Sequence, residues 1–286
     1  AVADSLGDDG VLADAEAAAR LFTDELIAAD KQLDVMSGSA GGILGLLRLH
    51  RDIGSAAALE RAIQCGAHLL AQPRLGPQGR RSWPIPGTDG KLLNGMSHGA
   101  SGFAYALAAL AAATGRDDFA DAAAECIAFE DSSYDGERRN WPDLRASQTH
   151  WPCQWCHGAT GIGLARLGIG KRRGALAERA DIENAVAGVQ LNAATPVDTL
   201  CCGTLGGIEF LCDAAGVLDR GDLRDIAARR LLAVVERAGA TGDYRWNNGK
   251  RQFNLGLFRG LAGVGYTLLR QAATPKTPLP NVLIWE

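Results

Sequence analysis

Three cysteines next to glycine-rich strings are the residues of this sequence best suited to chemistry. One lies in the string WCHG at 155–158, and the other two open the string CCG at 201–203. Three thiolates that leave a fourth coordination position open are typical of a catalytic zinc site rather than a closed structural one. Adjacent Cys201 and Cys202 cannot easily form a disulfide with each other, but both can reach one ion in a turn. We therefore predict a zinc site made of Cys156, Cys201 and Cys202.

The other cysteines stand in different surroundings. Cys65, Cys126 and Cys212 lie within apolar helical patterns, which indicates small core residues. Cys153 and His157 are rival ligands for the same ion, because they lie in the same segment as the first cysteine. Unliganded thiols at helix ends are the alternative to a metal site. An odd total of seven cysteines argues against a simple disulfide framework and indicates a reducing compartment.

A histidine and an aspartate precede two further glycine-rich strings. His98 stands directly before Gly99, and Asp34 stands four residues before Gly38. A histidine in this position can act as a general acid or base, and the alternative is a hydrogen-bonding structural residue. Asp34 is either a helix cap or an acid of the same site.

The pattern G-x-x-G followed by an apolar run occurs five times and organises the whole chain. Its copies begin at positions 38, 99, 158, 203 and 260, so successive copies lie 61, 59, 45 and 57 residues apart. Each copy predicts the start of an apolar inner helix. Repeated helical hairpins either stack into an open solenoid or close into a toroid.

The glycines favour closure, because they let backbones approach each other at one end of a central cavity. Helix N-termini and the polar residues beside the glycines would then converge on one rim. We therefore predict an all-α fold, an α/α toroid. The alternative is that the glycines only permit tight helix packing.

Amphipathic patterns between the copies predict the outer helices. Apolar residues at helical spacing predict one helix over 12–26, and segments 58–71 and 117–130 follow the same pattern. A further helix is predicted with Asp222 as its N-cap and Gly239 as its C-cap. Strand-like alternation is nearly absent.

Composition excludes several classes of protein. The net charge of −4, from 29 basic and 33 acidic residues, is unlike the basic footprint of a nucleic-acid binder. No apolar run reaches the roughly 18 residues of a membrane span. The chain opens AVADSLGDDG, with neither an initiator Met nor a targeting segment, so we expect a piece of a longer polypeptide or a processed chain. The composition of 36 glycines but only 10 prolines is unlike that of a disordered linker.

The motif set resembles the cyclase domain of lanthipeptide synthetases, specifically the C-terminal domain of bifunctional class II enzymes. The matching strings follow the family order from about residue 34 to residue 286: SGSAGGILGLLRL, LNGMSHGASGFAYAL, NWPDLR, WCHGATGIGLARLG, CCGTLGGIEFL, LFRGLAGVGYTLLR and LPNVLIWE. The resemblance implies a toroid of seven inner and seven outer helices with zinc at its mouth. It also implies that residues 1–286 form a single cyclase domain, preceded in the full synthetase by a dehydratase domain.

The resemblance also implies the metal ligands. Cys156 matches the family's zinc-binding cysteine in WC-x-G. Where the family usually has CHG this chain has CCG, so Cys201 and Cys202 take the places of the second cysteine and the histidine. That substitution resembles the three-cysteine subgroup, which includes the prochlorosin synthetases.

Catalytic residues carry over from the same motifs. His98 matches the family histidine assigned to proton transfer, and Asp34 matches the aspartate before the first G-x-x-G. Some stand-alone cyclases have an arginine four residues before the zinc cysteine, where this chain has Pro152. Arg145, in the WPDLR string, is therefore the expected cationic helper.

The implied function is that of a zinc-dependent lanthipeptide cyclase. Peptide cysteine thiols would add to dehydroalanine or dehydrobutyrine by intramolecular Michael addition, which forms lanthionine or methyllanthionine thioether rings. The expected partners are a dehydrated precursor peptide, leader plus core, and the dehydratase domain, and the expected location is the cytoplasm. One alternative is a zinc-containing peptide-binding scaffold without catalysis of its own. Another is a toroid glycosidase or lyase, which would need paired carboxylates at the inner helix starts.

Overall fold

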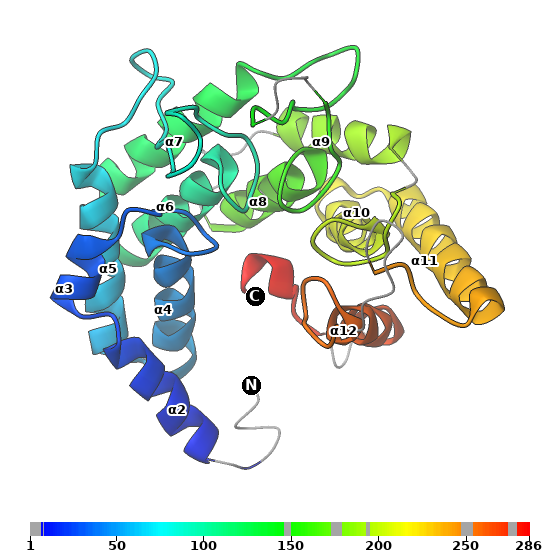
Figure 1. The fold of residues 1–286 in the computed structure, drawn as a ribbon, viewed down its shortest axis with the longest axis horizontal. Helices are drawn as coiled ribbons and strands as arrows, with labels where there is room; N and C mark the ends of the chain where they lie inside the picture. The colour runs from blue at the N-terminus through cyan, green and yellow to red at the C-terminus, as the bar shows by residue number, and fades with distance from the viewer. Residues whose placement is uncertain are drawn as a thin grey trace.

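Helices form almost all the regular structure of the chain (Figure 1). The computed structural model describes residues 7, 9–145, 150–172, 179–192, 195–246, 254–273 and 279–286. The helices are α2 (Asp9–Arg20), α3 (Asp24–Ala29), α4 (Ser39–Ile53), α5 (Ala56–Ala71), α6 (Ala100–Thr114), α7 (Asp117–Asp131), α8 (Ala159–Arg172), α9 (Arg179–Leu191), α10 (Thr204–Leu218), α11 (Gly221–Thr241), α12 (Leu261–Ala272) and the short 3-10 helix η2 (Val282–Ile284). Within these residues there is no β-strand, only isolated bridges such as Leu75 with Ser82.

The helices form two concentric layers. Figure 1 shows α4, α6, α8, α10 and α12 on the inside, with α5, α7, α9 and α11 outside them. Each outer helix up to α11 packs against the inner helix that precedes it, and successive inner helices are neighbours around the ring. Inner helices are the more apolar: every residue of α6 from Ala100 to Ala111 is buried. The all-α toroid predicted from the sequence is confirmed.

The number of hairpins differs from the expectation of seven. In the described part of the chain the ring has five inner helices, and all five begin at a G-x-x-G motif. In the described residues each interval of 45 to 61 residues from one motif to the next holds one inner and one outer helix. None of the described helices has the length and hydropathy that a membrane crossing requires.

The motif glycines are needed because the loop before each inner helix folds back onto the helix start. Gly158 has φ +87°, and a Cβ there would collide with the carbonyl oxygen of Pro152. A Cβ on Gly161, the second glycine of that motif, would collide with the carbonyl oxygen of Trp155. The same close approach recurs in the other four motifs. The backbones that crowd together therefore belong mainly to a single repeat, a loop and its own helix.

Two predicted outer helices have different bounds in the structure. The helix expected over 12–26 is broken at 21–23, because the Thr23 hydroxyl accepts a hydrogen bond from Leu26 N at 3.2 Å and so caps a new helix, α3. Helix α11 extends past both predicted caps. Asp222 is engaged by Arg220 at 2.6 Å instead of capping, and Gly242, in the left-handed conformation, ends the helix in place of Gly239.

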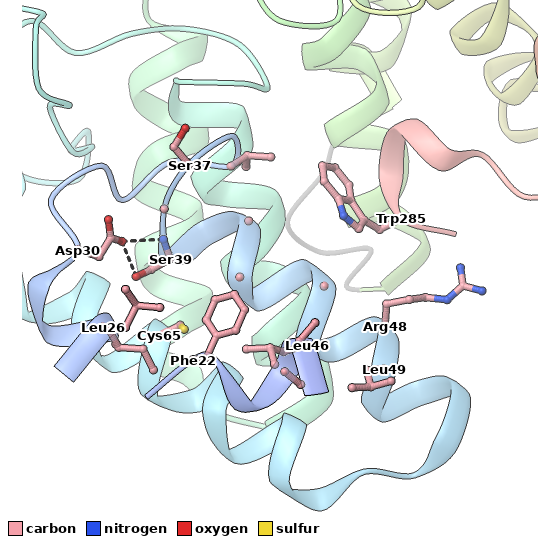
Figure 2. A pocket seen from close by; sticks show the side chains of 18 of the residues that line it. Phe22, Leu26, Asp30, Ser37, Ser39, Leu46, Arg48, Leu49, Cys65 and Trp285 are labelled. Atoms are coloured by element: carbon pink, nitrogen blue, oxygen red, sulfur yellow. Dashed lines mark hydrogen bonds between the residues drawn. The ribbon is translucent and has the colours of Figure 1, made fainter. Parts of the chain in front are cut away.

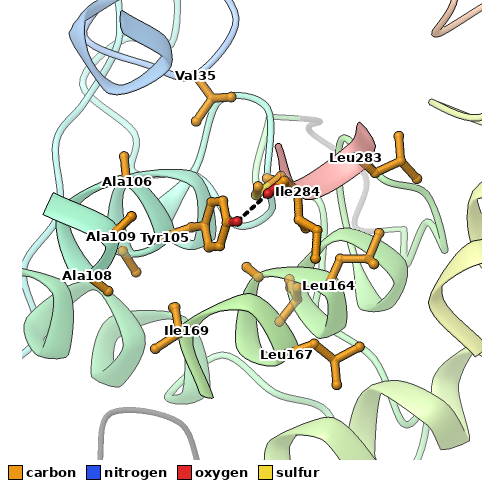
Figure 3. Packing of buried hydrophobic residues seen from close by; sticks show 14 of the residues in the cluster. Val35, Tyr105, Ala106, Ala108, Ala109, Leu164, Leu167, Ile169, Leu283 and Ile284 are labelled. Atoms are coloured by element: carbon orange, nitrogen blue, oxygen red, sulfur yellow. Dashed lines mark hydrogen bonds between the residues drawn. The ribbon is translucent and has the colours of Figure 1, made fainter. Parts of the chain in front are cut away.

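The last residues of the chain fill the middle of the ring. Figure 1 shows η2 inside the curve of the inner helices, and both Leu283 and Ile284 are fully buried. The Tyr105 hydroxyl donates to the carbonyl of Ile284 (Figure 3). The indole of Trp155 donates to the carbonyl of Leu283 at 3.1 Å. The C-terminal segment thus connects α6 to the loop that precedes α8.

Candidate metal centre and active site

The loops before α8 and α10 bring three cysteine thiols together. Cys202 Sγ lies 3.3 Å from Cys201 Sγ and 3.8 Å from Cys156 Sγ, and all three sulfurs are within 4.8 Å of one another. Thiolate sulfur is a donor that zinc favours, and three donors at such separations can hold one ion. The cluster is therefore a group that could bind a metal.

Backbone hydrogen bonds between neighbouring loops hold the cluster in place. Ser97 donates to the carbonyl of Cys156 from its backbone N at 3.3 Å and from its hydroxyl at 3.2 Å. Trp155 N donates to the carbonyl of Cys201 at 2.8 Å, and Cys201 N donates to that of Phe258 at 2.9 Å. Four consecutive loops of the ring are thus joined side by side at the same rim.

The crowding of the thiols perturbs their ionisation. Hydrogen bonds from Cys156 and Cys201 lower the pKa of Cys202, with a further contribution from the guanidinium of Arg259. Hydrogen bonds with Cys201 and Cys202 raise the pKa of Cys156 far above its usual value. The first thiolate to form therefore opposes ionisation of the others, and a cation among the sulfurs would remove that opposition. The donor set fits a bound metal ion for this reason.

The two rival ligands lie outside the cluster. Cys153 is buried with its Sγ 3.5 Å from the hydroxyl of Thr160, and burial raises the pKa of Cys153 to about 11. The Nδ1 of His157 lies 3.2 Å from the carbonyl oxygen of Asn94. Burial, together with the charge of Arg145, lowers the pKa of His157 to about 4, so its ring is neutral. Within the described residues the metal-binding group contains neither of them.

Asp34 and His98 form a pair on the loops before α4 and α6. The Nδ1 of His98 lies 2.6 Å from Oδ2 of Asp34, which is buried, while a third of the histidine side chain is exposed. Oδ1 of the same carboxylate accepts hydrogen bonds from the backbone N of Met36 at 2.9 Å and of Ser37 at 2.8 Å. The carboxylate holds the proton on Nδ1, so Nε2 is the nitrogen available for proton exchange. The ring also lies 6.1 Å from that of His157, centroid to centroid.

Arg145 lies at the edge of the cluster and is already paired. Its guanidinium binds both carboxylate oxygens of Asp143, with Nη2–Oδ2 at 2.6 Å and Nε–Oδ1 at 3.0 Å. Although burial opposes it, that contact lowers the pKa of Asp143 to about 2. Hydrogen bonding to Asp143 and, more weakly, the charges of Cys156 and Cys202 raise the pKa of Arg145. The guanidinium thus lies within electrostatic reach of the thiols, with its charge balanced by a carboxylate.

A second arginine, not found by sequence reasoning, touches the cluster directly. Nη2 of Arg259 lies 3.7 Å from the sulfur of Cys202. The sequence does carry a signal for it, because the residue directly before each motif glycine lies at the rim. That position holds Ser37, His98, His157, Cys202 and Arg259 in the five copies.

A cavity lies beside the Asp34 loop and not at the cysteines. It has a volume of about 880 Å³ between α2, α3 and α4, with Trp285 closing one end (Figure 2). Its wall is mostly apolar, with Phe22 and Leu46 among the side chains drawn. Met36 and Ser37, which follow Asp34, line its mouth, and none of the three clustered cysteines belongs to its lining.

Comparison with known proteins decides the family. A family model described as "Lanthionine synthetase C-like protein" matches residues 1–284. The chain belongs to the lanthionine synthetase C-like family. Among solved structures, nisin cyclase is similar with a TM-score of 0.62 and 17% sequence identity, over 91% of this chain and 68% of that chain. In total 19 chains of solved structures match, whereas a search of curated proteins finds no match.

This lanthionine synthetase C-like chain thus has the fold expected from its motifs, and the likeness to nisin cyclase supports that fold alone. Membership of the family confirms the expected enzyme type, a cyclase, and replaces the alternative of a carboxylate-based glycosidase or lyase. The roles of Cys156, Cys201, Cys202, His98, Asp34 and Arg145 stay predictions.

Proposed function

We propose that the chain is a zinc-dependent lanthipeptide cyclase. It adds cysteine thiols of a dehydrated precursor peptide to dehydroalanine or dehydrobutyrine, which closes lanthionine or methyllanthionine rings. The observation that carries this proposal is the convergence of three thiols within 4.8 Å on the rim of a lanthionine synthetase C-like ring. The Asp34–His98 pair, on the two preceding loops of the same rim, supports it.

Cys156, Cys201 and Cys202 would hold the zinc ion. Bound zinc would lower the pKa of a peptide thiol, so that thiolate is present near neutral pH. With three protein ligands, a bound zinc ion would have room for that thiol as a further ligand. Their formal charge with zinc is +2 − 3 = −1, one unit more negative than a set of two cysteines and a neutral histidine.

His98 would supply the proton that completes the addition. When the peptide sulfur bonds to Cβ of the dehydro residue, the electron pair of the C=C bond moves toward the carbonyl and leaves Cα to be protonated. Asp34 holds His98 Nδ1, so Nε2 donates to Cα and regains a proton equivalent to the one lost by the thiol. Arg145 would stabilise the enolate charge, because the N–H groups at the inner helix starts are already bonded to their own loops, as Gly161 N is to the carbonyl of Gln154.

The string CCG at 201–203 supports the narrower assignment to a class II, three-cysteine synthetase. We propose accordingly that residues 1–286 form one cyclase domain that works with a dehydratase domain of the same synthetase. Its substrate would carry a leader as well as a core, and both would meet in the cytoplasm.

Ring formation in a dehydrated model peptide, with one dehydroalanine and one cysteine, tests this function. We expect the peptide to lose its reactive thiol, counted by alkylation and mass spectrometry, only with zinc-loaded protein. Cys156→Ser would abolish the loss, whereas Cys212→Ser, which changes a thiol outside the cluster, would retain it. If zinc-loaded protein binds the peptide but every thiol stays alkylatable, the chain is a peptide-binding scaffold and the proposed function is wrong.

A further inference from the structure

Arg259 is held against the metal-binding cysteines by the residues beside it. Its neighbour Phe258 accepts a backbone hydrogen bond from Cys201 N at 2.9 Å. The Phe258 ring packs against Trp155, with ring centroids 4.8 Å apart. Trp155 itself directly precedes Cys156 in the chain. The loop before α12 is thus attached to the loops that carry all three thiols, and this attachment places the guanidinium next to Cys202.

The guanidinium of Arg259 contacts a cysteine sulfur. Its Nη2 lies 3.7 Å from Cys202 Sγ, and in the part of the chain that the structure describes no carboxylate pairs with it. Arg145 differs in this respect, because Asp143 binds its guanidinium through two oxygens. Of the two arginines at the rim, Arg259 is therefore the one whose positive charge is available to the cluster.

We propose that Arg259 is the positioning residue that balances the charge of the third cysteine ligand. The inference rests on the proposed zinc site, in which three thiolates give a formal charge of −1. One guanidinium in contact with Cys202 returns the local charge to −1 + 1 = 0. When a peptide thiolate binds, the charge becomes −1 instead of −2. Hydrogen bonds to a metal ligand typically raise metal affinity and orient the ligand, and a guanidinium bonds thiolate with charge assistance.

If Arg259 balances charge, its effect on zinc affinity requires the thiolate of Cys202. Replacing Cys202 with histidine removes one negative charge from the ligand set, because imidazole binds zinc in its neutral form. A guanidinium has little to gain from a neutral imidazole that already ligates a metal. The contribution of Arg259 to zinc binding therefore disappears in Cys202→His, whereas a purely structural contribution would persist.

Zinc affinity, measured by competition with a chelator at fixed pH and ionic strength, tests this dependence. We expect Arg259→Gln to weaken zinc binding about tenfold and Arg259→Lys, which keeps the charge, to weaken it less than about threefold. In the Cys202→His background, Arg259→Gln would change the affinity by less than about twofold. Arg229→Gln, on the outer helix α11, serves as the control and leaves the affinity unchanged.

Thermal unfolding of the metal-free proteins provides the second readout. Arg259→Gln is expected to unfold at the same temperature as the wild type, since its side chain is exposed. Equal zinc affinity in Arg259→Gln and wild type would overturn the inference, as would equal weakening in both backgrounds. Those results leave the zinc site intact. Absence of zinc binding by the wild type would instead overturn the proposed function itself.

Discussion

The buried carboxylate of Asp34 makes contacts in its own loop and with the neighbouring loop. One oxygen caps the turn that leads into α4, and the other holds His98, which is contributed by the next repeat. From the sequence, a cap and a site acid were alternatives for this residue. The structure does not make it the cap of α4, whose N-cap is Gly38 without a side-chain hydrogen bond. Its carboxylate instead closes the preceding turn and contacts His98, and its role as a site acid stays a prediction.

Replacing His98 tests its proton-transfer role. His98→Asn keeps an N–H donor for Asp34 but has no group that can donate a proton to carbon. We expect ring closure to slow by about 100-fold or more, in the usual range for loss of a general acid. Zinc content would stay at the wild-type level, because His98 is not a ligand.

The control for that variant is His50→Asn, in the last turn of α4, at the end of the helix away from the rim. It is expected to cyclise at the wild-type rate. Rates would be followed by loss of alkylatable thiol, and zinc by elemental analysis. A His98→Asn protein as fast as this control would exclude the proton-transfer role.

At the level of elements, the sequence predicts helix starts well and loop positions poorly. Each G-x-x-G marks a helix N-terminus because the close approach of its own loop demands glycine there, and that signal is local. The contacts that assemble the site join loops 45 to 61 residues apart, such as Ser97 with Cys156, and no local pattern encodes them. The position of Arg259 directly before a motif glycine predicts that it lies at the rim, but not that it contacts Cys202. The break at 21–23 was missed because Thr23 interrupts a helical spacing that otherwise continues.

Glycine-to-alanine variants test the importance of this loop-to-helix contact. At Gly158, φ is +87° and a Cβ would collide with the carbonyl of Pro152. Gly158→Ala is therefore expected to lower the free energy of unfolding by about 1–3 kcal/mol or more. Because Cys156 lies two residues away, zinc affinity would fall as well. Gly239→Ala, at an open position within α11, would instead stabilise by about 0.5–1 kcal/mol.

Urea unfolding of the two metal-free variants and of the wild type measures both changes in the free energy of unfolding. The two changes are expected to have opposite signs. A Gly158→Ala protein that matches wild type in both stability and zinc affinity would show that the close approach is dispensable.

For the whole molecule, the described ring consists of five inner helices with the chain's own C-terminus packed inside. The resemblance implies seven hairpins, whereas the described residues contain five inner helices, each of which begins at a motif. Its C-terminal segment connects α6 and the α8 loop through Tyr105 and Trp155. The string LPNVLIWE is part of the family resemblance, but nothing in its residue pattern predicts that it lies in the centre of the ring.

Removing one side chain of that segment tests its contribution to stability. Leu283 is fully buried, so Leu283→Ala is expected to lower the free energy of unfolding by about 2–5 kcal/mol. Leu279 is 37% exposed, and Leu279→Ala would cost less than about 1 kcal/mol. Urea unfolding of both variants measures these two losses in the free energy of unfolding. Equal losses would contradict a central packing role for the C-terminal segment.

X-ray absorption at the zinc edge counts the ligands of the proposed metal site. Three sulfur ligands at about 2.3 Å and one lighter ligand are expected in zinc-loaded protein. Addition of a peptide that carries a free cysteine would change this shell to four sulfurs. A resting shell of two sulfurs with a histidine nitrogen, or a three-sulfur shell that the peptide leaves unchanged, would contradict the account.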